Sequence, residues 1–240
     1  MSSFFVYYCY MKYNEKINSY LKLAELFNKN GFRLYIVGGA VRDYLLNKEL
    51  TDMDLTTDAT PNDVKTFFIE KADYTFSKFG AMSLYFENIK FEVTTLRVEK
   101  SYEDSRHPNE IFFVKEPKLD YKRRDFTINA MYLDERLTLL DFCDGKKDID
   151  NSLIRMVGNP LERINEDPLR ILRAIRFALT LSFKIEESLK TTIKNNHHLL
   201  DKINKDKIKQ ELKKFKNINE ETQTSLFNEF GMISCLDMVK

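Results

Sequence analysis

LYIVGGAVRDYLLNKELTDMDLTTD, residues 34–58, joins an apolar run to a helical pattern through a glycine pair. Residues 34–37 are predicted to form a strand that is buried on both faces. Gly38 and Gly39 follow, and a helix is predicted over residues 40–47 with Arg42 in its first turn. Because glycines let backbone N–H groups approach an anion at the start of a helix, this pattern favours a phosphate-binding turn.

A pair of carboxylates follows about ten residues later, in the sequence Asp52-Met53-Asp54-Leu55. In a strand, residues two apart share a face, so Asp52 and Asp54 are expected to point one way and the two apolar residues the other. Two neighbouring carboxylates repel each other unless a cation lies between them. Magnesium prefers oxygen ligands and substrate phosphates, so the pattern indicates phosphoryl or nucleotidyl transfer. The alternative is a structural turn followed by two surface aspartates.

Composition places few other limits on function. The chain has 240 residues, of which 31% are charged, and a net charge of +1, so nucleic-acid affinity would have to come from a local basic face. Its three cysteines include no CxxC pair, which is typical of the reducing cytoplasm. The apolar run at residues 4–11 is too short to span a bilayer, so no membrane association is expected.

Periodicity predicts further elements around residues 34–58. A helix with its apolar face at Ile17, Leu21, Ala24 and Phe27 is expected to end at Gly31. The other predicted elements are a helix over 62–71 after Pro61, a hairpin of 82–87 and 90–97 turning at Asn88-Ile89, and a mobile polar loop over 98–110.

Glu92 stands between Phe91 and Val93 in the second hairpin strand. Its carboxylate is therefore expected to face away from these apolar side chains. It is either a third acid beside the aspartate pair or a solvated glutamate on the outer face of the sheet.

The segment RRDFTINAM, residues 123–131, places Arg123, Arg124 and Asp125 ahead of an apolar stretch that is predicted to be helical. Guanidinium groups bind oxyanions in a bidentate way, so the arginines suit phosphate or ribose contacts. The structural alternative is a helix-capping aspartate with solvated arginines.

A second charged segment is INEDPLRILRAIRFALTL, residues 164–181. Its apolar positions predict one buried helix face. Charged residues recur every three positions on the other side, and this stripe consists of Asp167, Arg170, Arg173 and Arg176. Taken alone, the stripe is most simply a salt-bridged solvent face with Asp167 at the helix start.

Together, GGAVRD, DMDLTTDA, RRDFTINA and EDPLRILRAIRF resemble the nucleotidyltransferase superfamily. The resemblance is greatest to the class II tRNA nucleotidyltransferases (CCA-adding enzymes) and their bacterial poly(A) polymerase relatives. It implies an α+β fold, with a head of mixed β-sheet and helices over residues 1–150. An all-helical neck and a truncated body are expected over residues 151–240. The lead-in PKLDY departs from the acidic pattern usual in the family, so Asp120 is given no role.

The resemblance also implies roles for individual residues. Asp52 and Asp54 would hold two magnesium ions and, with Glu92, form the catalytic set. Cytosine and adenine both present an amino donor beside a ring-nitrogen acceptor, which Asp167 and Arg170 could read as acceptor and donor. The other expected nucleotide contacts are Gly38, Gly39, Arg42, Arg124, Arg173 and Arg176.

The implied reaction is template-independent addition of C and A from CTP and ATP to the 3′ end of tRNA, with release of pyrophosphate. Alternatives within the family are a poly(A) polymerase and an enzyme that adds only CC or only A. The alternative of another class is a non-catalytic RNA-binding fragment. Because full-length enzymes of this class run well past residue 240, a homodimer or a partner chain is expected to supply the missing body.

Overall fold

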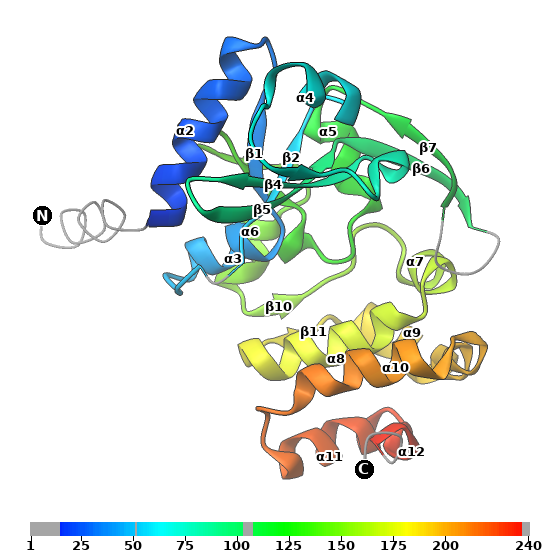
Figure 1. Ribbon diagram of the computed structural model, residues 1–240. Coiled ribbons are helices and arrows are strands. Elements are labelled where there is room, and N and C mark those ends of the chain that lie inside the picture. Colours follow the sequence, from blue (N-terminus) through cyan, green and yellow to red (C-terminus); the bar gives the residue numbers. More distant parts are fainter. Residues whose placement is uncertain (1–14, 51, 103–107, 237–240) are drawn as a thin grey trace, which may run out of the picture. The chain divides into compact units, whose positions relative to one another are not determined.

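The computed structural model describes residues 15–50, 52–102 and 108–236 (Figure 1). The chain forms two compact units whose segments alternate along the sequence. The sheet unit contains the described residues up to Val98 together with Ile111–Tyr121 and Asn129–Phe142. The helical unit contains the described residues of Glu99–Glu110, Lys122–Ile128 and the chain from Cys143 onward.

The sheet unit is built on a seven-stranded sheet in the order β3-β4-β5-β2-β1-β8-β9. The strands are β1 (Leu34–Val37), β2 (Asp54–Thr57), β3 (Ala72–Asp73), β4 (Ala81–Phe86), β5 (Ile89–Thr95), β8 (Met131–Leu133) and β9 (Leu139–Asp141). β2 and β5 run parallel, whereas β1 is antiparallel to both β2 and β8. This mixed sheet with its helices confirms the predicted α+β class.

Helix α2 (Glu15–Lys29) packs against β1, and of the predicted apolar face Ile17, Ala24 and Phe27 are buried, whereas Leu21 is only half-buried. The Tyr20 hydroxyl is buried there and donates a hydrogen bond to the Leu34 carbonyl at 2.9 Å. The helix ends at Lys29, and the turn that follows contains Gly31, whose φ of 82° is readily adopted only by glycine. Phe32 N–H closes this turn on the Phe27 carbonyl at 3.0 Å. Its buried side chains are Ile17, Ser19, Tyr20, Leu23, Ala24 and Phe27.

Strand β1 is buried along its whole length, as predicted. Leu34 and Ile36 alternate with Tyr35 and Val37, which point to the other face of the sheet. There Tyr35 and Val37 pack with the buried side chains of Leu96 and Tyr132. Each of these buried apolar side chains contributes about 1.5–3 kcal/mol to folding.

Helix α4 (Pro61–Phe67) begins as predicted but ends four residues before the predicted end at residue 71. Thr60 and Asp63 form a reciprocal capping box at its start, with Pro61 in the first turn. The helix stops because Phe68 takes an extended conformation and is buried. The residues that follow form the edge strand β3.

The hairpin of β4 and β5 turns at Glu87 and Asn88, one residue earlier than predicted. Both turn residues have positive φ, 49° and 64°, which matches a two-residue turn that follows the twist of the strands. The predicted loop over residues 98–110 is wrong at both ends. Strands β6 (Arg97–Tyr102) and β7 (Pro108–Phe113) pair there, and residues 103–107 lie outside the described residues.

The helical stretch predicted within residues 123–131 is also wrong. The chain forms helix α5 (Pro117–Asp120), two 3₁₀ turns (Tyr121–Arg123 and Thr127–Asn129) and then β8. Asp120 is buried and accepts hydrogen bonds from Arg97 N–H at 2.9 Å and the Tyr132 hydroxyl at 2.8 Å. Its contacts are therefore those of a structural residue of the sheet unit.

The helical unit has α8 (Leu169–Leu181) as its central helix, which contacts α7, α10 and α11. The other helices are α6 (Gly145–Asp150), α7 (Pro160–Glu166), α9 (Glu187–Asn196), α10 (Lys205–Leu212), α11 (Glu220–Glu229) and α12 (Ile233–Leu236). Strands β10 (Leu153–Ile154) and β11 (Lys184–Ile185) add a short parallel ladder. Across the described ranges of the chain, no helix is both long and apolar enough to cross a membrane.

Candidate nucleotide site

The glycine turn after β1 has the geometry that the sequence predicts. Gly38 has φ 74° and ψ −134°, a conformation open in practice only to glycine, and it caps α3 (Gly39–Leu45). Arg42 N–H bonds back to the Gly38 carbonyl at 3.3 Å. Gly39 lies against the Arg42 guanidinium, because a Cβ built on it would stand 3.4 Å from Nη2.

The Arg42 side chain is buried and held by two partners within the sheet unit. Its Nη1 donates to Asn129 Oδ1 at 2.7 Å, and its Nε donates to Asp43 Oδ1 at 2.9 Å. Asn129 lies in the turn before β8 and is itself buried. The guanidinium is therefore fixed beside the glycine turn before any ligand arrives.

Replacing Gly38 with alanine is expected to destabilise the protein by about 1–3 kcal/mol, because a Cβ strains the backbone at this φ and ψ. Gly39→Ala is the matched control, since its φ is not in the positive range and its Cβ would meet Arg42 at an ordinary contact distance. Urea unfolding of the two variants measures the difference. Equal stability of both would contradict the strain argument.

The aspartate pair shows the predicted alternation. Asp52 and Asp54 are exposed, whereas Met53 and Leu55 are 6% and 1% exposed. β2 begins at Asp54, so Asp52 lies just before the strand and not within it.

Glu92 lies directly opposite Asp54, because β2 and β5 pair in parallel with these two residues in register. Cross-strand partners in register share a face, so both carboxylates lie on the same side of the sheet. The Glu92 carboxylate accepts hydrogen bonds from Ser83 Oγ at 2.9 Å and from Lys90 Nζ at 2.5 Å. The structure thus brings the predicted third acid to the aspartate pair, and its catalytic role stays a prediction.

These acids suit a divalent cation of the oxygen-preferring kind. Among the described residues, no group of three or more His, Cys, Asp or Glu side chains is already gathered as a metal site. Magnesium commonly takes one or two carboxylates and completes its shell with water and substrate phosphates. An exposed aspartate pair with a glutamate in register fits that donor set.

The segment around Arg124 belongs to the helical unit. The Arg124 backbone is hydrogen-bonded to α7, and the neighbouring Asp125 pairs with α8. The Arg124 carbonyl accepts from Arg163 Nη2 at 2.9 Å. Asp125 forms an ion pair with Arg173, and this carboxylate raises the pKa of the Arg173 guanidinium. Arg173 therefore has a structural partner in addition to the nucleotide role predicted for it.

Asp167 lies between α7 and α8, where its Oδ1 accepts a hydrogen bond from Leu169 N–H at 3.1 Å. Arg170 is 6% exposed and donates to the Arg163 carbonyl at 2.6 Å and to Glu166 Oε2 at 2.9 Å. The stripe is therefore salt-bridged, as the structural interpretation expects, but Arg170 is buried and does not lie on a solvent face. Base reading by Asp167 and Arg170 stays a prediction.

Arg176 ties α8 to α10. Its Nε donates to Glu211 Oε1 at 2.8 Å, and its guanidinium lies 4.2 Å from the centre of the Phe177 ring. Burial would raise the pKa of Glu211, but hydrogen bonds from Lys214 and Arg176 outweigh it and hold the pKa below its usual value.

Glu211→Gln is expected to lower the free energy of unfolding by about 1–3 kcal/mol at neutral pH, because Arg176 then loses its buried carboxylate partner. Because the pKa of Glu211 is lower in the folded protein than its ordinary value of 4.5, its charge stabilises the fold fully above pH 4.5. This stabilisation is lost as the pH falls through the folded-state pKa. The difference between wild type and variant should therefore shrink in acid. Urea unfolding at neutral and acidic pH tests this, with the exposed Glu220→Gln as control, and a pH-independent difference would contradict it.

The sequence analysis did not identify several residues that hold the predicted site residues in place. Asn129 lies 87 residues from Arg42, so no local pattern links them. Arg163 and Glu166 stand at helical spacings from Arg170, and that spacing is the only sequence signal for their ion pairs.

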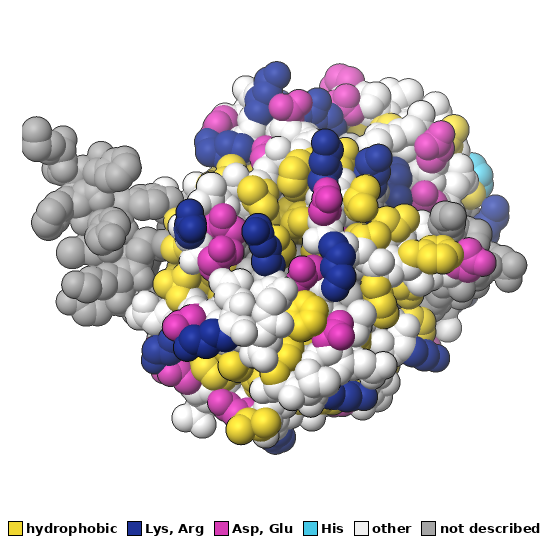
Figure 2. Space-filling model, turned by 90° about the horizontal axis from the view of Figure 1, so that it is seen from above, with side chains coloured by type: hydrophobic (Ala, Val, Ile, Leu, Met, Phe, Trp, Pro, Cys, Tyr) yellow, Lys and Arg dark blue, Asp and Glu magenta, His cyan; other side chains and the backbone are white. Residues whose placement is uncertain are grey.

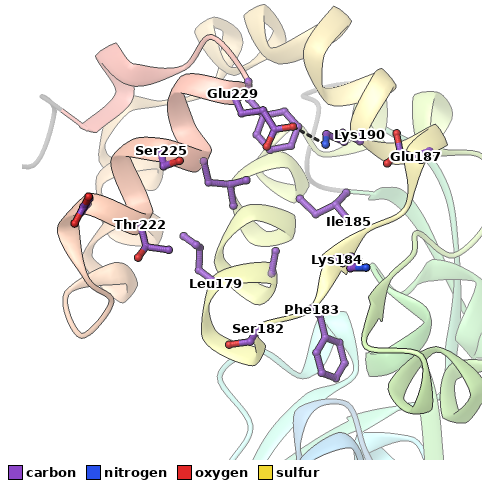
Figure 3. Close-up of a pocket in the computed structure, with 14 residues that line it drawn as sticks. Leu179, Ser182, Phe183, Lys184, Ile185, Glu187, Lys190, Thr222, Ser225 and Glu229 are labelled. Carbon is purple, nitrogen blue, oxygen red and sulfur yellow. Dashed lines mark ion pairs between the residues drawn. The ribbon is translucent and has the colours of Figure 1, made fainter.

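One pocket in the described part of the chain is separate from these groups. A cavity of about 700 Å³ lies in the helical unit, lined by the C-terminal end of α8, β11, α9 and α11 (Figure 3). Lys190 and Glu229 form an ion pair of 2.5 Å at its wall. Among the residues that the structure describes, those lining it include no predicted site residue. On the face seen in Figure 2, basic, acidic and hydrophobic side chains are interspersed.

The glycine turn and the acids on β2 and β5 define a nucleotidyltransferase-type head. The sequence model of the poly A polymerase head domain matches residues 34–155, and the chain belongs to this family. This confirms the resemblance found in the sequence.

Curated relatives of the chain are CCA-adding enzymes. That of Enterococcus faecalis is 46% identical over 181 residues, which are 75% of this chain and 44% of the relative. That of Lactobacillus helveticus is 42% identical over 184 residues, or 77% of this chain and 46% of the relative. The chain thus spans about half the length of the curated relatives it matches.

Solved structures show the same similarity. The Bacillus stearothermophilus CCA-adding enzyme in complex with CTP superposes with a TM-score of 0.83 at 32% identity, covering 93% of this chain and 54% of that one. The Thermotoga maritima CCA-adding enzyme complexed with tRNA gives a TM-score of 0.73 at 27% identity, covering 92% and 52%. A nucleotidyltransferase family implies dependence on a divalent metal.

Proposed function

We propose that this chain carries the catalytic part of a tRNA nucleotidyltransferase, which adds C and A from CTP and ATP to the 3′ end of tRNA. In this proposal residues 1–150 form the head, and residues 151–240 form the helical neck and part of the body. Support comes from the CCA-adding relatives and from solved neighbours that bind CTP, ATP or tRNA. The proposed location is the cytoplasm.

The observation that carries this proposal is the placement of the acids. Asp54 and Glu92 lie in register on the parallel strands β2 and β5, and exposed Asp52 precedes Asp54 by two residues. Asp52 and Asp54 are two residues apart, and Glu92 lies beside Asp54 in the middle of the sheet, where like charges repel each other. Lys90 pairs with Glu92, and a divalent cation would offset the charge of the two aspartates, which favours a catalytic role over a structural one.

The proposed cation is magnesium, held by Asp52 and Asp54 with Glu92 beside them. When bound, magnesium supplies positive charge that stabilises the negative charge developing on the reacting oxygens. The chain's own part is to hold the substrates. The glycine turn at Gly38 and Gly39 offers backbone N–H groups to the triphosphate, and the fixed Arg42 guanidinium adds charge beside it.

The helical unit is proposed to contribute further nucleotide contacts. Arg124 would bind the nucleotide through its guanidinium, with Arg173 and Arg176 as additional basic groups. Asp167 would accept from the amino group of cytosine or adenine while Arg170 donates to the ring nitrogen. Guanine and uracil would present the opposite pattern and leave both contacts mismatched.

A second candidate is a poly(A) polymerase, which the name of the matching family favours. The two activities share the nucleotide site and differ in product. CC-only or A-only addition differs from full CCA addition in the same way. A homodimer or a partner chain is also part of the proposal.

Incubating the protein with tRNA that lacks its 3′ end, labelled CTP and ATP, and magnesium tests these candidates by product length. Three added nucleotides ending in A support CCA addition. A long ladder from ATP alone would favour the poly(A) polymerase, and one or two added nucleotides would favour a partial activity. Binding of tRNA without any addition would favour the RNA-binding fragment.

A further inference from the structure

Arg163, in α7, is a buried arginine whose side chain reaches the segment that contains Arg124. It is 8% exposed. Its Nη2 donates to the Arg123 carbonyl at 2.6 Å and to the Arg124 carbonyl at 2.9 Å. These residues stand 40 and 39 positions away in the chain and lie in the same helical unit.

The charge of Arg163 is balanced locally. Its Nη1 pairs with the Glu166 carboxylate, which also accepts from Arg170 Nη1 at 2.9 Å. Arg170 in turn donates to the Arg163 carbonyl at 2.6 Å. The two buried arginines and the partly exposed Glu166 thus form one network that fixes the direction of the Arg163 side chain.

A guanidinium that bonds two successive carbonyls fixes the backbone between them. The peptide units of Arg123 and Arg124 cannot rotate without breaking one of these bonds, which join a charged donor to a neutral acceptor. The direction in which the Arg124 side chain leaves the backbone is thereby set. The Asp125–Arg173 ion pair anchors the next residue of the same segment.

We propose that Arg163 is a positioning residue for the nucleotide site: it acts through the backbone of Arg123 and Arg124 and orients the Arg124 guanidinium toward the nucleotide. This inference rests on the proposed function. It assigns a role to a residue outside the motifs that the sequence analysis singled out. Lysine could not replace it fully, because an ammonium lacks the planar fork that reaches both carbonyls.

The test measures the equilibrium affinity of the full chain for CTP and ATP in magnesium. Arg163→Gln is expected to weaken both affinities by about tenfold, and Arg163→Lys by less, because lysine keeps one carbonyl bond. The decisive variant is the double mutant with Arg124→Gln. If Arg163 acts through Arg124, then Arg163→Gln should add little to the loss already caused by Arg124→Gln.

Ile193→Val is the matched control, because this buried α9 residue lies outside the network and its substitution lowers stability alone. It should lower Tm and leave the affinities unchanged. Wild-type affinity in folded Arg163→Gln, or equal losses with and without Arg124, would overturn the proposal. If Arg163→Gln does not fold, Arg163→Lys decides by the same two comparisons. Wild-type protein that binds neither nucleotide would instead overturn the proposed function on which the inference rests.

Discussion

Asp54→Ala is expected to abolish nucleotide transfer, lowering kcat/KM by at least about a thousandfold while the protein stays folded. Asp54 begins β2 with its carboxylate exposed and in register with Glu92, so the side chain adds little to the core. Removing it takes away a ligand for the proposed magnesium. The free energy of unfolding should change by less than about 1 kcal/mol, as for most surface substitutions. Transfer of labelled CTP to tRNA and urea unfolding measure the two effects.

Asp73→Ala is the matched control for this loss. Asp73 is an exposed aspartate on β3 of the same sheet, and its carboxylate accepts hydrogen bonds from Thr75. Asp73→Ala changes the net charge by the same amount as Asp54→Ala and should leave nucleotide transfer unchanged. Near wild-type turnover in folded Asp54→Ala would refute the metal role of the acid pair.

Asp167→Ala is expected to change which nucleotide is used. If the carboxylate accepts from the amino group of cytosine and adenine, its loss should cost about 1–3 kcal/mol for CTP and ATP, or about tenfold to a hundredfold in kcat/KM. GTP and UTP should lose much less, because they make no such contact. Measurement of kcat/KM for the four triphosphates provides the comparison.

Asp167→Asn separates base reading from helix capping. Asp167 also accepts a hydrogen bond from Leu169 N–H at the start of α8, and an amide oxygen can keep that bond. The Asp167→Asn variant is thus expected to preserve stability and still lose the preference for C and A. A preference unchanged in both variants, with only stability altered in Asp167→Ala, would leave Asp167 as a capping residue.

Local patterns in the sequence predicted the parts of the fold that depend on burial. The fully apolar run at 34–37 became β1, and the alternation around Met53 and Phe91 placed the acids on the exposed side. Gly38 was recognisable because its turn needs a conformation that other residues avoid.

Elements that depend on distant partners were not predictable in this way. The end of β6 and the start of β7 are polar in sequence, and their low strand propensity suggested a loop. The pairing of the two strands overrides this local propensity. The segment after Arg124 reads as helical, yet hydrogen bonds of Thr127 to Asp148 and to the Arg155 backbone hold it as a turn. The link from Arg163 to Arg123 and Arg124 leaves no sequence motif, because it is made to backbone carbonyls.

The most direct test of the central claim is to follow the α-phosphate of CTP. Wild-type protein, magnesium and tRNA lacking its 3′ end should transfer label from the α-phosphate into RNA and release pyrophosphate in equal amount. The same tRNA with a 3′-deoxy terminus should accept no label, because the attacking hydroxyl is missing. Label that stays in the free nucleotide with both RNAs would contradict nucleotidyl transfer by this chain.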